Sequence, residues 1–185
     1  RHIYANVDGA VTALYEYHKI IEDAIPAERL AYAGIPIDLR KVKPSAMPPS
    51  GAGNPVRIMV AYPRARMIEK GADRLVAVAR ELERRYPGRI VVDEVTQLPY
   101  NLFVERIKQS HIIVDQLYSY TPGTTALLAM AMGRVTVSGG EEEYYQFIGE
   151  GSLRPIVNTD PADLDETMRR LEAVAADRDR LMAMA

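Results

Sequence analysis

The stretch from His111 to Gly133 constrains the fold more than any other part of the chain. It begins with an apolar run that is typical of a buried strand and then reaches a turn marked by Pro122 and Gly123. From Thr124 to Met132 the sequence contains neither Gly nor Pro and shows no polar face after its first turn. This pattern favours a helix packed inside the protein, with the rest of the chain organised around it.

The backbone at the start of this helix is suited to binding an anion. Its first free N–H groups are expected at Gly123, Thr124 and Thr125. Unpaired donors and the helix dipole give such a helix start partial positive charge, which can hold a phosphate. The alternative is that Thr124 only caps a core helix.

Composition excludes several classes of protein. A chain of 185 residues with 48% hydrophobic content suits one ordinary domain, or one domain plus an appendage, with a real core. A net charge of -2 argues against a nucleic-acid binder. No apolar run approaches the roughly 20 residues of a membrane span, and no signal-peptide pattern opens the chain. There is no Cys, and the three His show no ligand spacing, so we predict no metal and a soluble cytoplasmic protein.

A segment rich in Pro and Gly divides the chain. Before it, we predict short strands at residues 10–14 and 30–33 and a helix at residues 16–24. The segment itself, residues 41–56, has the composition of a linker. We therefore predict an N-terminal part at residues 1–40, a linker at 41–56 and a main domain at 57–185.

After the linker, apolar runs alternate regularly with helical patterns. The predicted strands are residues 57–62, 89–95, 111–115, 134–137 and 155–158. The predicted helices are residues 72–86, 100–109, 124–132 and 141–148, with a last helix begun by Asp160-Pro161 and reaching Ala175. This alternation predicts an α/β fold, a Rossmann-like doubly wound parallel sheet with helices on both faces.

Ligands of such sheets bind beyond the carboxyl ends of the strands. The first main-domain strand runs into a loop that holds Arg64, Arg66 and Lys70, next to a helix start at Gly71. A planar guanidinium and a compact ammonium together suit a diphosphate. The alternative is an ordinary solvated loop, which is the usual place for charged residues.

Two other turns on the same edge are candidates. The second strand is followed by Thr96, in a stretch whose backbone can contact the edge of a nucleobase. The third strand leads to the turn before Thr124. Glu141, Glu142 and Glu143 follow a strand as well. We interpret them as an exposed first helical turn favoured by the dipole, with a contact to a sugar as the alternative.

Three short sequence motifs follow one another along the main domain: Lys70-Gly71-Ala72-Asp73, Asp115-Gln116-Leu117 and Ala129-Met130-Ala131-Met132-Gly133. In this order and spacing they resemble the C-terminal, nucleotide-sugar-binding half of group-one glycosyltransferases, which have the GT-B architecture of two Rossmann-like domains. The resemblance runs from about Arg57 to the end of the chain. Residues 10–38 look like the end of the family's N-terminal domain.

The resemblance implies a donor site and a reaction. Lys70 and Arg64 would be the catalytic residues, neutralising charge on the leaving diphosphate. The donor would be a nucleotide-diphosphate sugar, with no cofactor and no metal. The acceptor, a glycan or a lipid-linked saccharide, would bind through the N-terminal domain. The other expected donor-binding residues are Arg66, Gly71, Thr96, Gly123, Thr124 and Thr125.

The chain departs from the family at two positions. The family usually has two Glu residues separated by seven positions, and Tyr120 and Leu128 stand there in this sequence. A Leu cannot accept a hydrogen bond from a ribose hydroxyl, which weakens binding. Either the donor is held differently, or this is a diverged, non-catalytic sugar-nucleotide-binding or scaffold domain.

Two further expectations concern activity and fold. We expect this chain alone to bind donor weakly and to transfer nothing, and the family resemblance leans towards retention of the sugar's configuration. An unrelated doubly wound domain, such as a phospho-acceptor receiver, is the last alternative. It lacks the acidic cluster expected there, because the first strand ends in Tyr62-Pro63.

Overall fold

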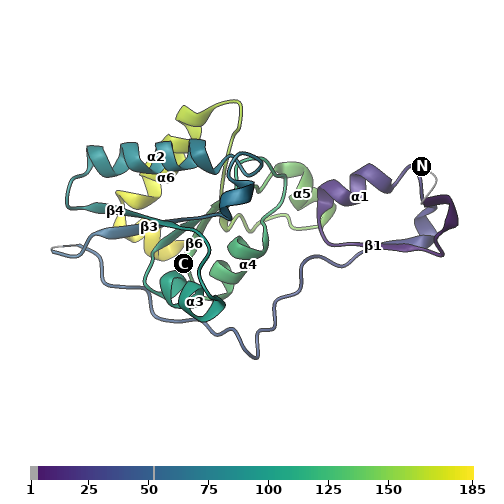
Figure 1. Ribbon diagram of the computed structural model, residues 1–185, viewed down its shortest axis with the longest axis horizontal. Helices are drawn as coiled ribbons and strands as arrows, with labels where there is room; N and C mark the ends of the chain where they lie inside the picture. Colours follow the sequence, from purple (N-terminus) through teal and green to yellow (C-terminus); the bar gives the residue numbers. More distant parts are fainter. Residues whose placement is uncertain (1–3, 52) are drawn as a thin grey trace.

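Five strands form one parallel sheet, in the order β4-β3-β5-β6-β7 (Figure 1). The computed structural model describes residues 4–51 and 53–185. The strands are β3 (Val56–Ala61), β4 (Ile90–Val95), β5 (Ile112–Val114), β6 (Val135–Ser138) and β7 (Ile156–Asn158). The predicted α/β fold with a doubly wound parallel sheet is confirmed.

Helices cover both faces of this sheet. On one face, side chains of α2, α6 and α7 share an apolar cluster with the strands, and on the other face α3 and α4 do so. Across the described ranges, no helix is both long and apolar enough to cross a membrane. The helices are α2 (Ala72–Arg85), α3 (Tyr100–Lys108), α4 (Thr124–Ala131), α5 (Glu142–Phe147), α6 (Leu164–Ala175) and α7 (Arg178–Ala183).

The amphipathic pattern of α2 explains its place on the sheet. Leu75, Val78, Ala79 and Leu82 recur at intervals of three and four residues, and all four are buried. Fully burying a Leu or Val side chain stabilises the fold by about 1.5 to 3 kcal/mol. The predicted helix is therefore correct to within one residue, since it ends at Arg85 with Tyr86 as its C-cap.

The outer edge of β4 is covered by side chains of α2. The Val92 N–H donates to Glu83 Oε1 at 2.9 Å, and Arg80 Nη1 donates to the Val92 carbonyl at 3.1 Å. Arg80 also pairs with Glu94 at 2.8 Å. Charged side chains thus occupy backbone groups that would otherwise be free to bind another strand.

The N-terminal part lies to one side of the sheet, beside α5 (Figure 1). β1 (Ala10–Thr12) and β2 (Leu30–Tyr32) form a separate parallel pair, connected through α1 (Tyr15–Ile21). The short helices η1 (Tyr4–Asn6) and η2 (Ala27–Arg29) complete it. Val11 is 71% exposed and Ile20 is 70% exposed, so this part has little core of its own.

Two buried side chains fasten the Pro-rich segment to the main domain. Arg134 donates to the carbonyls of Ser45 and Ala46 and to the Ser45 hydroxyl, at 2.6 to 3.0 Å. His111 contacts the Pro48 carbonyl through Nε2 at 3.1 Å. Residues 41–51 and 53–55 of this segment contain no helix or strand, yet these contacts hold Ser45, Ala46 and Pro48 against the domain.

The last predicted helix begins later than the sequence pattern indicated. Asp160 does not start it, because its carboxylate accepts from the N–H groups of Ala162 and Asp163 in a turn. Asp163 is the N-cap instead, and its carboxylate accepts from the Glu166 N–H at 2.8 Å. The prediction of this start was wrong because two Asp residues offer competing caps. The helix α7 was not predicted.

Stability should depend on pH through His111. Its Nδ1 accepts from the Arg57 N–H at 3.0 Å, so the ring is neutral, and burial lowers its pKa. As pH falls through the ordinary His value of about 6.5, the unfolded chain takes up this proton first and the free energy of unfolding decreases. Urea unfolding at pH 7.5 and 5.5 should show a smaller decrease in His111→Gln than in the unmodified chain. Equal decreases in the free energy of unfolding would contradict this role of His111, since the two proteins share all other titratable groups.

Candidate functional site

The loops after all five strands gather at one edge of the sheet because the strands are parallel. The loop after β3 is residues 62–71, which include η3 (Arg64–Arg66). Those after β4, β5 and β6 are residues 96–99, 115–123 and 139–141. The predicted site residues all lie in these loops or at the helix starts that follow them.

A buried ion pair joins the two central loops. Lys70 Nζ lies 2.7 Å from Asp115 Oδ1, and the two side chains are 13% and 0% exposed. Asp115 Oδ2 has no hydrogen-bond partner in the described part of the chain. A buried charge is tolerated only when it is paired, so each of these groups holds the other at the edge.

The three cations of the first loop have different partners. Arg64 Nε donates to Thr96 Oγ1 at 3.3 Å, and Arg66 pairs with Glu69 at 2.9 Å in an exposed position. Lys70 turns inwards to Asp115. Arg64 therefore links two predicted site loops, whereas Arg66 is held at the surface.

Gly71 serves close packing and does not offer a free N–H. Its φ is 63°, and a Cβ at this position would lie 2.7 Å from Leu117 Cβ. Its N–H donates to the Ile68 carbonyl at 3.0 Å. The predicted helix start at Gly71 is confirmed, since Gly71 is the N-cap of α2, but the preceding turn already uses its N–H.

The start of α4 agrees with the expected geometry. Gly123 is the N-cap without a side-chain cap, and within the described residues no protein acceptor takes the N–H groups of Gly123, Thr124 or Thr125. A Cβ on Gly123 would lie 2.5 Å from Asp115 Oδ2. The free donors of α4 thus border the ion pair.

A cavity of about 210 Å³ opens between the ends of β3 and β4. Its side-chain walls include Pro63, Leu98 and Phe103, and Thr125 of α4 closes one side. Gln97 also lines it, with a φ of 53° that is unusual for a residue other than Gly. Flat apolar walls with one amide suit a planar ring.

Glu16 of the N-terminal part binds the loop after β5. Its carboxylate accepts from the Tyr120 N–H at 3.0 Å, from Thr121 Oγ1 at 2.9 Å and from the Ser119 hydroxyl. The Tyr120 carbonyl in turn accepts from the Glu141 N–H at 3.1 Å. The loop is therefore held from both sides.

Aromatic rings extend this contact. The Phe147 ring of α5 lies 5.1 Å from Tyr15, 4.9 Å from His18 and 5.0 Å from Tyr32, between ring centroids. Such pairs contribute about 0.5 to 1.5 kcal/mol each beyond the area that they bury. The N-terminal part is thus attached next to the site.

The two positions without the expected Glu have different surroundings. Tyr120 is 50% exposed, and its ring lies 6.0 Å from Tyr15. Leu128 is buried in the apolar cluster of α3 and α4 with Met132. In the described part of the chain, no three His, Asp or Glu side chains gather as they would around a metal.

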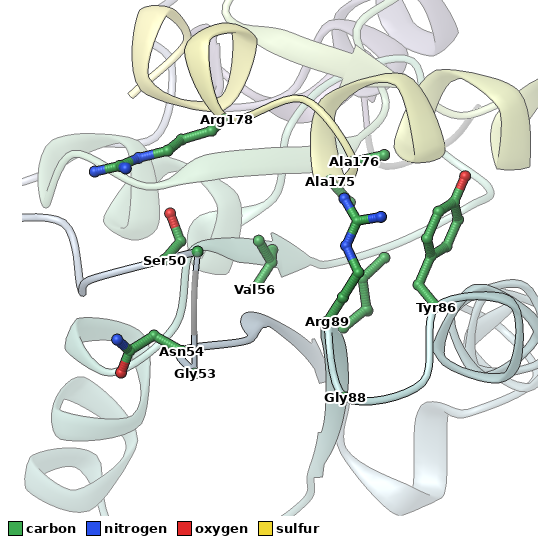
Figure 2. A pocket seen from close by; sticks show the side chains of 12 residues that line it. Ser50, Gly53, Asn54, Val56, Tyr86, Gly88, Arg89, Ala175, Ala176 and Arg178 are labelled. Atoms are coloured by element: carbon green, nitrogen blue, oxygen red, sulfur yellow. The ribbon is translucent and has the colours of Figure 1, made fainter.

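Another cavity, of about 330 Å³, lies at the opposite edge of the sheet (Figure 2). Val56 and Ile90, the first residues of β3 and β4, line it together with Arg89 and Arg178. This edge carries the amino ends of the strands, so the cavity is separate from the candidate site.

Comparison with solved structures identifies the architecture. No protein-family model matches the sequence, and no curated protein does. S. aureus TarM, solved with UDP, Fondaparinux and alpha-GlcNAc-glycerol, is similar with a TM-score of 0.66 at 8% identity, over 98% of this chain and 39% of TarM. The chain has the GT-B fold over the part of these structures that it covers.

Two further GT-B structures agree. The pneumococcal O-GlcNAc transferase GtfA, solved with UDP and GlcNAc, gives a TM-score of 0.57 at 13% identity, over 99% of this chain and 42% of GtfA. The lipopolysaccharide outer core galactosyltransferase WaaB gives 0.57 at 15% identity, over 96% of this chain and 57% of WaaB. The chain spans less than two thirds of each of these GT-B chains.

Sequence reasoning missed two residues that shape the site. Asp115 carried a signal, since an acid directly after a buried strand falls at the ligand-binding edge. Glu16 carried none, because it lies 104 positions from Tyr120 and meets it only through tertiary packing.

Gly139, in the loop after β6, packs so tightly against the loop after β5 that there is no room for a side chain. A Cβ there would lie 2.0 Å from the Ser119 carbonyl oxygen, which is backbone and cannot swing away. We expect Gly139→Ala to lower the free energy of unfolding by about 1 to 3 kcal/mol, measured in urea. Gly151→Ala is the matched control, because nothing lies within 4 Å of its Cβ position. Similar midpoints for both variants would contradict this packing.

Proposed function

We propose that this chain is the donor-binding part of a glycosyltransferase. The parent protein would transfer a sugar from a nucleotide-diphosphate sugar to an acceptor, a glycan or a lipid-linked saccharide. The observation that carries the proposal is the Lys70 ammonium, fixed by Asp115 at the carboxyl edge of a GT-B sheet. An ammonium has three donors and Asp115 takes one, so two are left for diphosphate oxygens.

The diphosphate and the base of a donor can be assigned to two neighbouring places at this edge. The diphosphate would lie between Lys70 and the free N–H groups that start α4. The base would enter the 210 Å³ cavity and stack on Leu98 and Phe103. In support, TarM and GtfA were both solved in complex with UDP.

The proposed reaction needs charge stabilisation at this edge. The acceptor oxygen bonds to the anomeric carbon, the bond from that carbon to the diphosphate breaks, and the electron pair leaves with the diphosphate. Lys70 and Arg64 neutralise the charge that develops there. The acceptor proton passes to a base. We assign that base and the acceptor site to the N-terminal domain, of which residues 1–40 would be a remnant joined by the linker at 41–56.

A second candidate is a sugar-nucleotide-binding domain without catalysis. The uncharged Tyr120 and Leu128 favour it, because neither offers a carboxylate to a sugar or ribose hydroxyl. Calorimetric titration of the full-length protein with UDP, GDP and ADP sugars, with and without acceptor saccharides, separates the two. Binding without turnover would favour the second candidate.

Loss of the Lys70 ammonium should weaken nucleotide binding. A charge-assisted contact contributes about 1.5 to 3 kcal/mol, so Lys70→Ala should raise the UDP dissociation constant by roughly 10- to 150-fold in calorimetry. Lys19→Ala is the control, because Lys19 lies on α1 and pairs with Glu22 in the N-terminal part.

The double variant Lys70→Ala/Asp115→Asn separates binding from folding. Lys70→Ala alone leaves the Asp115 carboxylate buried without its cation, which destabilises the fold. The double variant removes that charge and still lacks the ammonium, so it should stay folded and bind UDP weakly. Affinity equal to that of the unmodified chain would refute the assignment of Lys70.

A further inference from the structure

A short strap of chain crosses the two helices on one face of the sheet. The strap, residues 41–45, begins where the N–H groups of Lys41 and Val42 donate to the Asp38 carbonyl at 3.0 and 2.9 Å. It ends at Ser45, whose carbonyl and hydroxyl accept from Arg134. The Ser45 end is bonded to the main domain, and Val42 packs against the apolar cluster of α3 and α4, so the strap lies along these helices.

A cavity of about 420 Å³ lies between this strap and the two helices. Leu128 and Met132 are buried residues of the adjoining core, and Val42 packs against that core. Val104 of α3 lines the same space, and so does Tyr100, which is 68% exposed. The volume is within the range of ligand pockets, and its apolar walls offer water few partners.

Three ammonium groups belong to the same cavity. Lys41, Lys43 and Lys108 line it, and no carboxylate does. Lys108 pairs with Glu105 at 2.6 Å. Within residues 4–51 and 53–185, Lys41 and Lys43 have neither an ion pair nor a side-chain hydrogen bond. Uncompensated positive charge therefore borders an apolar space, although the chain as a whole carries a net charge of -2.

We propose that this cavity binds an anionic amphiphile, with the hydrocarbon chain between α3 and α4 and the phosphate or carboxylate head at Lys41 and Lys43. The apolar part of the wall, formed by Val104, Leu128 and Met132, favours a hydrocarbon chain, because polar groups placed there would be left without hydrogen bonds. The lysines select an anionic head over a neutral one by charge complementarity. The site is distinct from the donor edge and does not depend on the proposed function.

The cavity of Figure 2 provides an internal contrast. Two cations, Arg89 and Arg178, line it as well, together with apolar residues such as Val56 and Ile90. The Arg89 guanidinium is already stacked on the Tyr86 ring, 5.5 Å from its centroid. The Arg89 cation is therefore already engaged, whereas Lys41 and Lys43 have no ion-pair or hydrogen-bond partner for their side chains among the described residues.

Calorimetry with monododecyl phosphate below its critical micelle concentration tests the site. The unmodified chain should bind it with one-to-one stoichiometry. Lys41→Gln/Lys43→Gln should bind about tenfold more weakly, since two partly solvated charge contacts are lost. Val104→Phe should also bind more weakly because the ring fills the space for the chain. Arg89→Gln/Arg178→Gln, which removes the same charge at the other cavity, should bind as the unmodified chain does.

Several outcomes would overturn the inference. They are absence of binding, equal binding of inorganic phosphate or of dodecanol, and unchanged affinity in both the lysine and the Val104 variants. Circular dichroism of each variant verifies folding. Lys70→Ala/Asp115→Asn should bind the amphiphile normally, so failure of the donor site and failure of this site are distinguishable.

Discussion

The ion pair between Lys70 and Asp115 determines how the carboxyl edge of the sheet is built. It joins the loops after β3 and β5, two neighbouring strands at the centre of the sheet. Glycines allow the close packing around this pair, since a Cβ on Gly71 would meet Leu117 of the loop after β5 and one on Gly123 would meet Asp115 itself. A side chain at Gly71 would push the two loops apart, and one at Gly123 would displace the Asp115 carboxylate from Lys70.

The cations at this edge already have partners, so the site presents little free positive charge. Arg64 and Arg66 are each engaged on a neighbour, and Lys70 shares its ammonium with a carboxylate. A diphosphate would therefore add to existing contacts without finding an open cluster of cations. Affinity would depend on how much of each ammonium or guanidinium is left unshared.

The sequence was most informative where periodicity alone decides structure. Helix α2 and strands β3 and β5 were predicted closely because their apolar spacing matches a single face or a buried run. Contacts between distant residues were beyond prediction, and Glu16 is the clearest case. Composition was less informative for residues 41–56, since Pro and Gly indicate a linker but do not reveal that Arg134 and His111 contact it. The bond that the Gly71 N–H makes was not predicted, because local hydrogen bonds in a turn leave no trace in the residue types.

The covered edge of β4 has a consequence for assembly. An exposed edge strand can template a continuous sheet across two molecules, and such pairing is a common route to dimers and to fibrils. At Val92 both backbone groups are already bonded to side chains of the same chain. Another copy would have to displace Glu83 and Arg80 before its own strand could join. The sheet is thus closed to growth on this side by α2, at a width of five strands.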